Sequence, residues 1–191
     1  MGSKMATRER LLEAAEEMFS AKGYYDTAVD EIVQRSNTSK GAVYFHFPSK
    51  EGLFLAVVDH LGDRLIQRVE EGISTAVDPQ ERLDIALTTT LETLTKHKTL
   101  AGLLLSKGFG MGSPFVLKRR QVFGRFADQI KTLLDAALPQ SKADTLNTNV
   151  IAYAWLGAIS EVVVKWLETG TPHPMDDALP TLRLLFLNTL D

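Results

Sequence analysis

Residues 38–51 read TSKGAVYFHFPSKE, and this stretch decides how the N-terminal part of the chain folds. After a polar break at residues 36–38, a short helix is predicted over residues 39–46. That helix ends at Phe47, because a residue that precedes proline avoids helical angles. Ser49 then caps a longer helix that starts directly after it.

A second short helix is predicted just before this stretch, over residues 28–35. Thr27 and Asp30 have the form of a capping box, in which two side chains satisfy amide groups at the start of a helix. Two short helices separated by three polar residues have the dimensions of a helix-turn-helix, whose second helix enters the major groove of DNA. The sequence therefore predicts a DNA-reading helix over residues 39–46.

The charge of this segment favours a phosphate partner, although the whole chain is acidic. The 191 residues carry 21 Lys and Arg against 24 Asp and Glu, a formal net charge of −3. Residues 32–50 contain the cations Arg35, Lys40 and Lys50 and no carboxylate. Because each neutralised phosphate releases counterions, DNA binding depends on this local field and not on the net charge.

Several side chains of the segment suit DNA contacts. Hydroxyl and amide donors at a helix N-terminus favour phosphate, and a glycine lets the helix backbone approach the duplex. Tyrosine and histidine can donate to phosphate oxygens or contact a thymine methyl group. The predicted DNA-binding residues are Thr38, Ser39, Lys40, Gly41, Tyr44, His46 and Lys50.

Other residues of the segment are assigned to the fold. Val43, Phe45 and Phe47 are predicted to be core residues that seal the short helices against the first helix. Thr27 is assigned to capping in preference to DNA contact. Tyr44 is placed on the DNA side, with a half-buried ring and an exposed hydroxyl as the alternative.

Residues 38–51 closely resemble the DNA-binding signature of the TetR/AcrR family of bacterial transcriptional repressors, and residues 23–27, GYYDT, match it as well. The resemblance covers about the first 50 residues. It implies a homodimer that binds a palindromic double-stranded DNA operator and releases it on binding a small effector. Ala28 departs from the pattern, since the family often has serine or threonine there, so one phosphate contact is expected to be missing.

The rest of the chain is also predicted to be helical, because strand alternation is absent. An apolar content of 45% is enough for a core, and the lack of cysteine excludes a disulfide scaffold and a thiol nucleophile. Helices are expected to start at Asp78 and Ser113, to run over residues 141–169, and to end with one over 177–190. We predict an all-α fold of about nine helices, with a helix-turn-helix domain over residues 5–50 and an effector-binding and dimerisation domain over residues 51–191.

The last two predicted helices suit a dimer interface. One short reading helix discriminates weakly, so two half-sites about 34–36 Å apart must be bound together. Small residues allow close approach of two helices, and apolar residues of the last helix add buried area. The predicted interface residues are Ala154, Gly157, Ala158, Leu182 and Phe186. The alternative is that these helices pack inside one protomer.

A second basic cluster lies over residues 107–131, where six cations stand against one acid, Asp128. An apolar cavity rimmed by cations suits an amphiphilic anion such as an acyl thioester of coenzyme A. The predicted effector-binding residues are Phe109, Met111, Phe115, Arg119, Arg120, Phe123, Phe126 and Trp155. The alternative is a glycine-rich kink followed by a solvated basic face, with the aromatic residues in an ordinary core.

The same region is similar to the corresponding stretch of TetR-type repressors of fatty-acid degradation, through residues 110–115, 118–120 and 123–126. That resemblance implies long-chain acyl-coenzyme A as the effector. Another hydrophobic or aromatic small molecule is the alternative.

Enzymatic and membrane functions find little support in the sequence. The four histidines are scattered, and no catalytic, cofactor or metal-binding spacing stands out. The longest uncharged run, residues 145–160, is shorter than the roughly 20 apolar residues of a membrane-spanning helix. We therefore expect a cytoplasmic protein that is not an enzyme, with a helical enzyme acting on acyl substrates and a ligand-free architectural DNA-binding protein as competing classes.

Overall fold

The computed structural model describes residues 2–106, 112–143 and 145–187, and this part of the chain contains helices and no strand. The all-α prediction is therefore confirmed. The elements are α1 Gly2–Asp26, α2 Val29–Ser36, α3 Lys40–His46, α4 Lys50–Ile73, α5 Pro79–Lys96, α6 Lys98–Ala101, the π-helix η1 Gly102–Ser106, α7 Ser113–Ala137, α8 Gln140–Ala143, α9 Thr148–Thr169, the π-helix η2 Pro174–Ala178 and α10 Leu179–Leu187.

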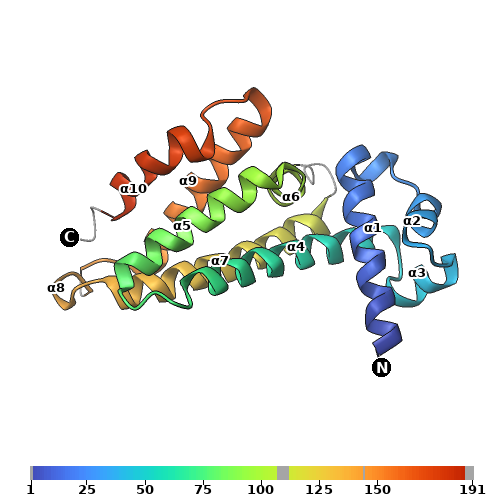
Figure 1. The fold of residues 1–191 in the computed structure, drawn as a ribbon, viewed down its shortest axis with the longest axis horizontal. Coiled ribbons are helices and arrows are strands. Elements are labelled where there is room, and N and C mark those ends of the chain that lie inside the picture. The colour runs from blue at the N-terminus through green and yellow to red at the C-terminus, as the bar shows by residue number, and fades with distance from the viewer. Residues whose placement is uncertain (1, 107–111, 144, 188–191) are drawn as a thin grey trace.

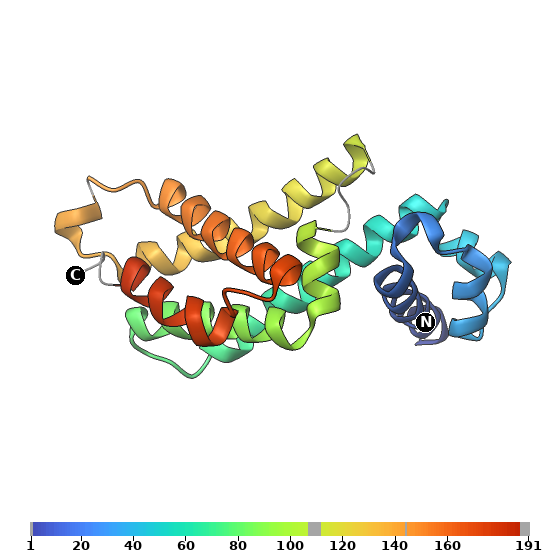
Figure 2. The ribbon, with the colours of Figure 1, turned by 90° about the horizontal axis from the view of Figure 1, so that it is seen from above.

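The helices form a small N-terminal unit and a larger bundle. Figure 1 shows α1, α2 and α3 together at one end of the molecule, with α4 leading away from them beside α7. Helices α5, α9 and α10 complete the bundle, and Figure 2 shows the same separation from above. Helix α4 packs against both α1 and α7, so it connects the two parts.

Three of the predicted helix starts are confirmed by their caps, whereas Ser113 lies inside α7 after the N-cap residue Gly112. The hydroxyl of Ser49 accepts a hydrogen bond from the amide of Gly52 at 2.9 Å, and the Asp78 carboxylate accepts one from the amide of Glu81 at 2.8 Å. Ser39 likewise caps α3. These contacts satisfy amide groups that have no partner within the helix.

The predicted capping box at Thr27 is wrong. Thr27 is 1% exposed, and its hydroxyl donates backward to the carbonyl of Gly23 at 2.7 Å and to that of Met18 at 3.1 Å. The Glu31 carboxylate accepts from the amide of Ala28 at 2.9 Å and takes the capping role. Thr27 instead fixes the turn in which Gly23 has a φ of 80°, a left-handed angle that suits glycine.

Two predicted boundaries in the second half also differ. The run over residues 141–169 is divided into α8 and α9, because the Asn147 side chain accepts from the amides of Asn149 and Val150 at 3.1 and 3.3 Å and starts a new helix. The last helix is preceded by η2, so α10 begins at Leu179.

The core is continuous from the N-terminal unit into the bundle. The Phe54 ring of α4 meets the Phe19 ring of α1 at 5.0 Å and the Phe115 ring of α7 at 6.0 Å. Further along, α4 and α7 approach closely at Gly62, where a Cβ atom would lie 2.7 Å from a methyl carbon of Val122. A larger residue than glycine at position 62 would force these two helices apart.

Among the described helices, α9 has the length and apolar composition to cross a membrane, with a mean hydropathy of 1.5. Its inner face is buried in the protein core through Ala152, Trp155, Ile159, Val163 and Trp166. The core helix of a soluble protein passes the same test of length and composition. Packing within the protomer thus explains why the inner face of α9 is apolar.

Candidate nucleic-acid interface

Helix α3 lies at the outer edge of the N-terminal unit (Figure 1). Val43 is 1% exposed and Phe47 is 3% exposed, so these two residues anchor the segment in the core as predicted. Lys40, Gly41 and Tyr44 are exposed. Because α3 is anchored on one side only, its other side is open to a large partner such as a duplex.

The prediction that Phe45 is a core residue is wrong. Its side chain is 66% exposed, and its ring meets that of His46 edge to face at 5.1 Å. The reason is helical periodicity, because Val43 and Phe47 are four positions apart and share the inner face, whereas Phe45 lies between them and points away. That spacing was available in the sequence. Phe45 therefore joins the surface that α3 presents.

Two of the three cations of residues 32–50 are already paired with carboxylates from other helices. The Lys40 ammonium lies 2.8 Å from the Asp30 carboxylate of α2, and this hydrogen bond raises the pKa of Lys40. The Arg35 guanidinium forms two hydrogen bonds with the Glu17 carboxylate of α1, one of them at 2.9 Å. All four side chains are more than half exposed, so phosphate groups could replace these carboxylates without burying a charge.

The hydroxyls beside α3 and the third cation take part in local contacts. The Thr38 hydroxyl lies 2.8 Å from that of Ser36. Lys50 donates from Nζ to the carbonyl of Tyr25 at 3.1 Å, and the same ammonium lies 4.6 Å from the centre of the Tyr24 ring. Lys50 therefore ties the start of α4 to the end of α1, and it holds its charge at the edge of the reading unit.

We expect Asp30→Asn to raise the affinity for DNA. The substitution removes the carboxylate that competes with phosphate for Lys40, and an exposed pair of this kind corresponds to a gain of about two- to fivefold. Fluorescence anisotropy of a labelled duplex over a range of salt concentrations measures the effect. Asp26→Asn is the matched control, because it removes the same charge from another exposed position. Equal gains in the two variants would show that only net charge matters.

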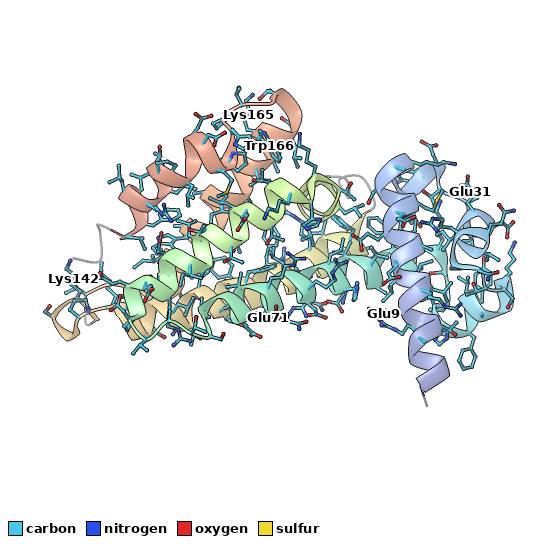
Figure 3. All side chains as sticks on the ribbon, in the orientation of Figure 1. Glu9, Glu31, Glu71, Lys142, Lys165 and Trp166 are labelled. Carbon is cyan, nitrogen blue, oxygen red and sulfur yellow. The ribbon has the colours of Figure 1, made fainter. Side chains whose placement is uncertain are left out.

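Helix α4 is tied by ion pairs to the helices on either side of it. Toward the N-terminal unit, Arg64 pairs with Glu16 at 3.0 Å, and His60 lies 3.5 Å from Glu9, which is labelled on α1 in Figure 3. Toward the bundle, the Arg125 guanidinium of α7 pairs with both Asp59 and Asp63 of α4. A movement of α7 can therefore reach α1 through α4.

The structure brings only part of the predicted effector site together. Phe109 and Met111 lie outside the described residues. Phe115 is 2% exposed and packs against the α4 residue Phe54, so it belongs to the joint between the two parts of the protein.

The remaining predicted residues divide between the surface and the interior. Arg120 is exposed, and the half-buried Arg119 guanidinium lies 4.3 Å from the centre of the Phe123 ring. Burial lowers the pKa of Arg119. Phe126 and Trp155 both line an apolar cavity inside the bundle. Phe126 and Trp155 thus lie in the interior, whereas Arg119 is half-buried and Arg120 lies on the surface of α7.

Two small apolar cavities lie next to each other in the bundle, with volumes of about 40 and 30 Å³. They share the lining residues Thr90, Phe126, Leu156 and Ile159, so together they form one apolar seam between α4, α5, α7 and α9. A typical small-molecule site has roughly 300–1,000 Å³. The seam is therefore closed in this structure, and a ligand could enter only if the helices moved apart.

The sequence did not identify the α5 side of the seam. Leu83, Leu87 and Thr90 line it, but an amphipathic helix shows only that one face is buried and not what that face meets. The aromatic residues of α7 and α9 were conspicuous because aromatic side chains are few.

The predicted dimer residues also divide into two groups. Ala154 and Gly157 of α9 are exposed, and Ala158 is partly buried. Leu182 and Phe186 are 4% and 7% exposed and belong to the protomer core. Phe186 stacks on Trp155, with ring centres 4.4 Å apart and planes within 10°.

The apolar residues that α9 and α10 leave exposed are different ones. They are Val150 and Tyr153, which are 62% and 52% exposed, and Leu184 and Leu185, which are 64% and 58% exposed. The ion pair of Arg183 with Asp84, together with its hydrogen bond to Thr88 at 3.0 Å, holds α10 against α5 and turns this face outward.

The described residues contain no group of three or more histidine, aspartate or glutamate side chains that could hold a metal ion. A short, exposed helix follows a polar turn in the N-terminal unit, and a separate helical bundle encloses an apolar seam. These features define a helix-turn-helix protein in which a DNA-binding type of unit is joined to a separate helical bundle.

Known proteins agree with this class. Residues 11–57 match the family described as bacterial regulatory proteins, tetR family. The uncharacterized HTH-type transcriptional regulator YdgC of Bacillus subtilis (strain 168) is 26% identical over 96% of this chain and 93% of its own length. The fatty acid degradation regulator FadR from Bacillus halodurans has a TM-score of 0.82 at 19% identity, over 96% of this chain and 99% of that one. FadR from Bacillus subtilis in complex with stearoyl-CoA has a TM-score of 0.79 at 18% identity, over 93% and 97%.

Three further curated relatives match over 42–54% of this chain, and these matches cover only 36–44% of their own lengths. The likeness to the two FadR structures shows a shared fold. Taken together, these matches confirm the resemblance of residues 38–51 to the family. Residues 11–57 therefore form a DNA-binding region of the TetR-family type, and the whole chain shares the fold of the two FadR structures.

Proposed function

We propose that the protein binds a palindromic operator as a homodimer and represses transcription. When a hydrophobic effector, a fatty acyl-coenzyme A, enters the bundle, the protein releases the operator. The observation that carries this proposal is a closed apolar seam in a bundle that α4 joins to the unit with the exposed helix α3. The predicted DNA contacts are those of the sequence, Thr38, Ser39, Lys40, Gly41, Tyr44, His46 and Lys50, with Phe45 added by its exposure. The regulator acts in the bacterial cytoplasm.

The closed seam supports regulation by a ligand. A ligand shifts a conformational equilibrium only by its difference in affinity between the two states. Because the cavities of about 40 and 30 Å³ are too small for an acyl chain, the effector binds only a bundle in which α5, α7 or α9 has moved. Binding energy is thereby coupled to helix movement, and the Arg125 pairs carry that movement to α4.

The shape and charge of the bundle favour an acyl thioester over other hydrophobic effectors. The lining of the seam passes along α4 from Val69 in the first cavity to Leu65 in the second, and this course suits an unbranched chain more than a broad aromatic molecule. Arg119 and Arg120 on α7 provide cations for the phosphates of coenzyme A. A related fold, that of FadR from Bacillus subtilis, was solved in complex with stearoyl-CoA.

The test measures operator release over a series of acyl chains. An operator is first selected from random duplexes with the purified protein, and its affinity is then measured with medium-chain to long-chain acyl-coenzyme A, with free coenzyme A and with aromatic compounds. We expect release that grows with chain length and is absent with coenzyme A alone. Unchanged operator affinity with all acyl chains would reject the acyl-coenzyme A effector, and release by an aromatic compound would favour the alternative ligand class.

The competing functions give different results in the same preparation. An enzyme acting on acyl substrates would hydrolyse the thioesters and would show no salt-sensitive operator binding. An architectural DNA-binding protein would protect DNA equally with and without every ligand.

A further inference from the structure

Two buried nitrogen atoms near the distal end of the apolar seam have no hydrogen-bond partner within the described structure. They are the side-chain amide Nε2 of Gln129 on α7 and the Nε atom of Arg82 on α5. A buried donor without a partner costs free energy, roughly 1–3 kcal/mol in mutational studies, and few such groups occur in a protein. Two of them, on residues that line one cleft, therefore point to a missing acceptor.

Gln129 stands at the junction between the seam and the surface. It lines the first apolar cavity together with Leu83 and Trp155. It also lines a surface cleft of about 340 Å³, where Arg82 and Leu133 are among its neighbours. The two unpartnered donors thus lie where an apolar chain would leave the seam and meet water.

The direction of the seam follows from the residues that line it. On α4 the lining passes from Glu70 in the cleft to Val69 in the first cavity and Leu65 in the second. On α5 it passes in the same way from Arg82 to Leu94. The second cavity ends under Leu104 and Leu105 of η1, an element that packs against α1 of the DNA-binding unit.

We infer that the effector carries an uncharged hydrogen-bond acceptor, such as the carbonyl of a thioester, ester or amide, that binds Gln129 and Arg82 while its apolar chain extends toward η1. This inference rests on the proposed effector site and defines how a ligand lies in it. Glu70 and Asp128 also line the cleft and disfavour a carboxylate in place of the uncharged acceptor. The far end of the chain meets η1, so chain length decides how strongly the ligand presses on the contact with α1.

The experiment compares two uncharged probes that differ in one acceptor, a medium-chain methyl ketone and the alkane of the same length. Their affinities are measured by isothermal titration calorimetry with the wild-type protein and with Gln129→Leu. We expect Gln129→Leu to weaken the ketone about 5- to 30-fold and to leave the alkane unchanged or tighter, because only the ketone loses a buried hydrogen bond. Arg82→Met, as a second variant, is expected to act in the same direction.

A matched control and a stability readout separate this role from a structural one. Thr90 lines the same seam, but its hydroxyl already donates to the carbonyl of Ala86 at 2.7 Å, so Thr90→Val is expected to affect both probes equally. The ligand-free Gln129→Leu protein should melt at or above the wild-type temperature, since an unpartnered amide leaves the interior.

Three results would overturn the inference. They are an equal loss of both probes in Gln129→Leu, an unchanged ketone affinity in that variant, and a failure of the wild-type protein to bind either probe. Operator release by acyl-coenzyme A is measured independently. If acyl-coenzyme A releases the operator although one of these three results is found, the inference is wrong and the proposed function is retained.

Discussion

Replacing Leu184 and Leu185 together by glutamate is expected to turn the proposed dimer into a monomer and to lower operator affinity by about 100-fold or more. Both side chains are more than half exposed on α10, and Ala154 and Gly157 of α9 are exposed as well. Four charges brought together in a symmetric interface would repel each other. A monomer holds one half-site only, and it loses the gain of roughly 10²–10⁴ that linkage of two binding units provides.

Analytical ultracentrifugation measures the oligomeric state, and anisotropy with a full operator and with a half-site measures the affinity. Val116→Glu with Leu117→Glu is the matched control, because these neighbours on α7 are 52% and 55% exposed. The control should leave the dimer intact, and half-site binding should be equal in all proteins. A Leu184→Glu, Leu185→Glu protein that still sediments as a dimer would move the interface to another face.

Arg125→Met is expected to separate effector binding from operator release. The guanidinium of Arg125 is held by Asp59 at 2.9 Å and by Asp63, both on α4, so it joins the bundle to the helix that reaches the DNA-binding unit. Allosteric coupling is typically 1–3 kcal/mol, or about 5- to 150-fold in affinity. The variant should bind acyl-coenzyme A within about threefold of wild type and lose most of this shift in operator affinity.

Lys131→Met is the control for that experiment, since Lys131 pairs only locally with Asp135, four residues further along α7, in an ion pair at 2.5 Å. Its operator release should match that of the wild type. Effector titration by calorimetry and operator titration with saturating effector give the two quantities separately. Full release by the Arg125→Met protein would show that the movement reaches α4 through packing, for example at Gly62 and Val122, and not through the ion pairs.

The two experiments examine different steps of one mechanism. Loss of the dimer abolishes simultaneous reading of two half-sites, with or without effector. Loss of the Arg125 pairs leaves reading intact and removes its control. If both variants behave as expected, the protein is a repressor whose ligand changes the relative positions of the two DNA-binding units in the dimer.

The local features of the reading unit could be predicted from the sequence. The helices around residues 28–35 and 39–46, the cap at Ser49 and the buried Val43 follow from rules that involve neighbours only a few positions away. Phe45 shows how such a rule fails when residue type is considered without position. Its aromatic ring suggested the core, yet its place between Val43 and Phe47 puts it on the outer face.

Charge and burial between helices were less predictable. The absence of carboxylates in residues 32–50 suggested three free cations, but Asp30 and Glu17 come from α2 and α1 to pair with two of them. Likewise, Phe186 was assigned to the dimer face, but it stacks on Trp155 of the same protomer. A helical pattern shows that a face is apolar and does not show which surface covers it.

Local patterns in the sequence were enough to predict that this protein is helical, that its N-terminal unit is a helix-turn-helix, and that residues 38–51 resemble TetR-type regulators. Three features depend on the packing of distant helices: which carboxylates pair with Lys40 and Arg35, where the apolar seam runs, and that Gln129 and Arg82 line one cleft at its end. The physical reason is range. Capping and periodicity act within one or two helical turns, whereas pairing, cavities and exposed faces depend on how helices distant in the chain pack together.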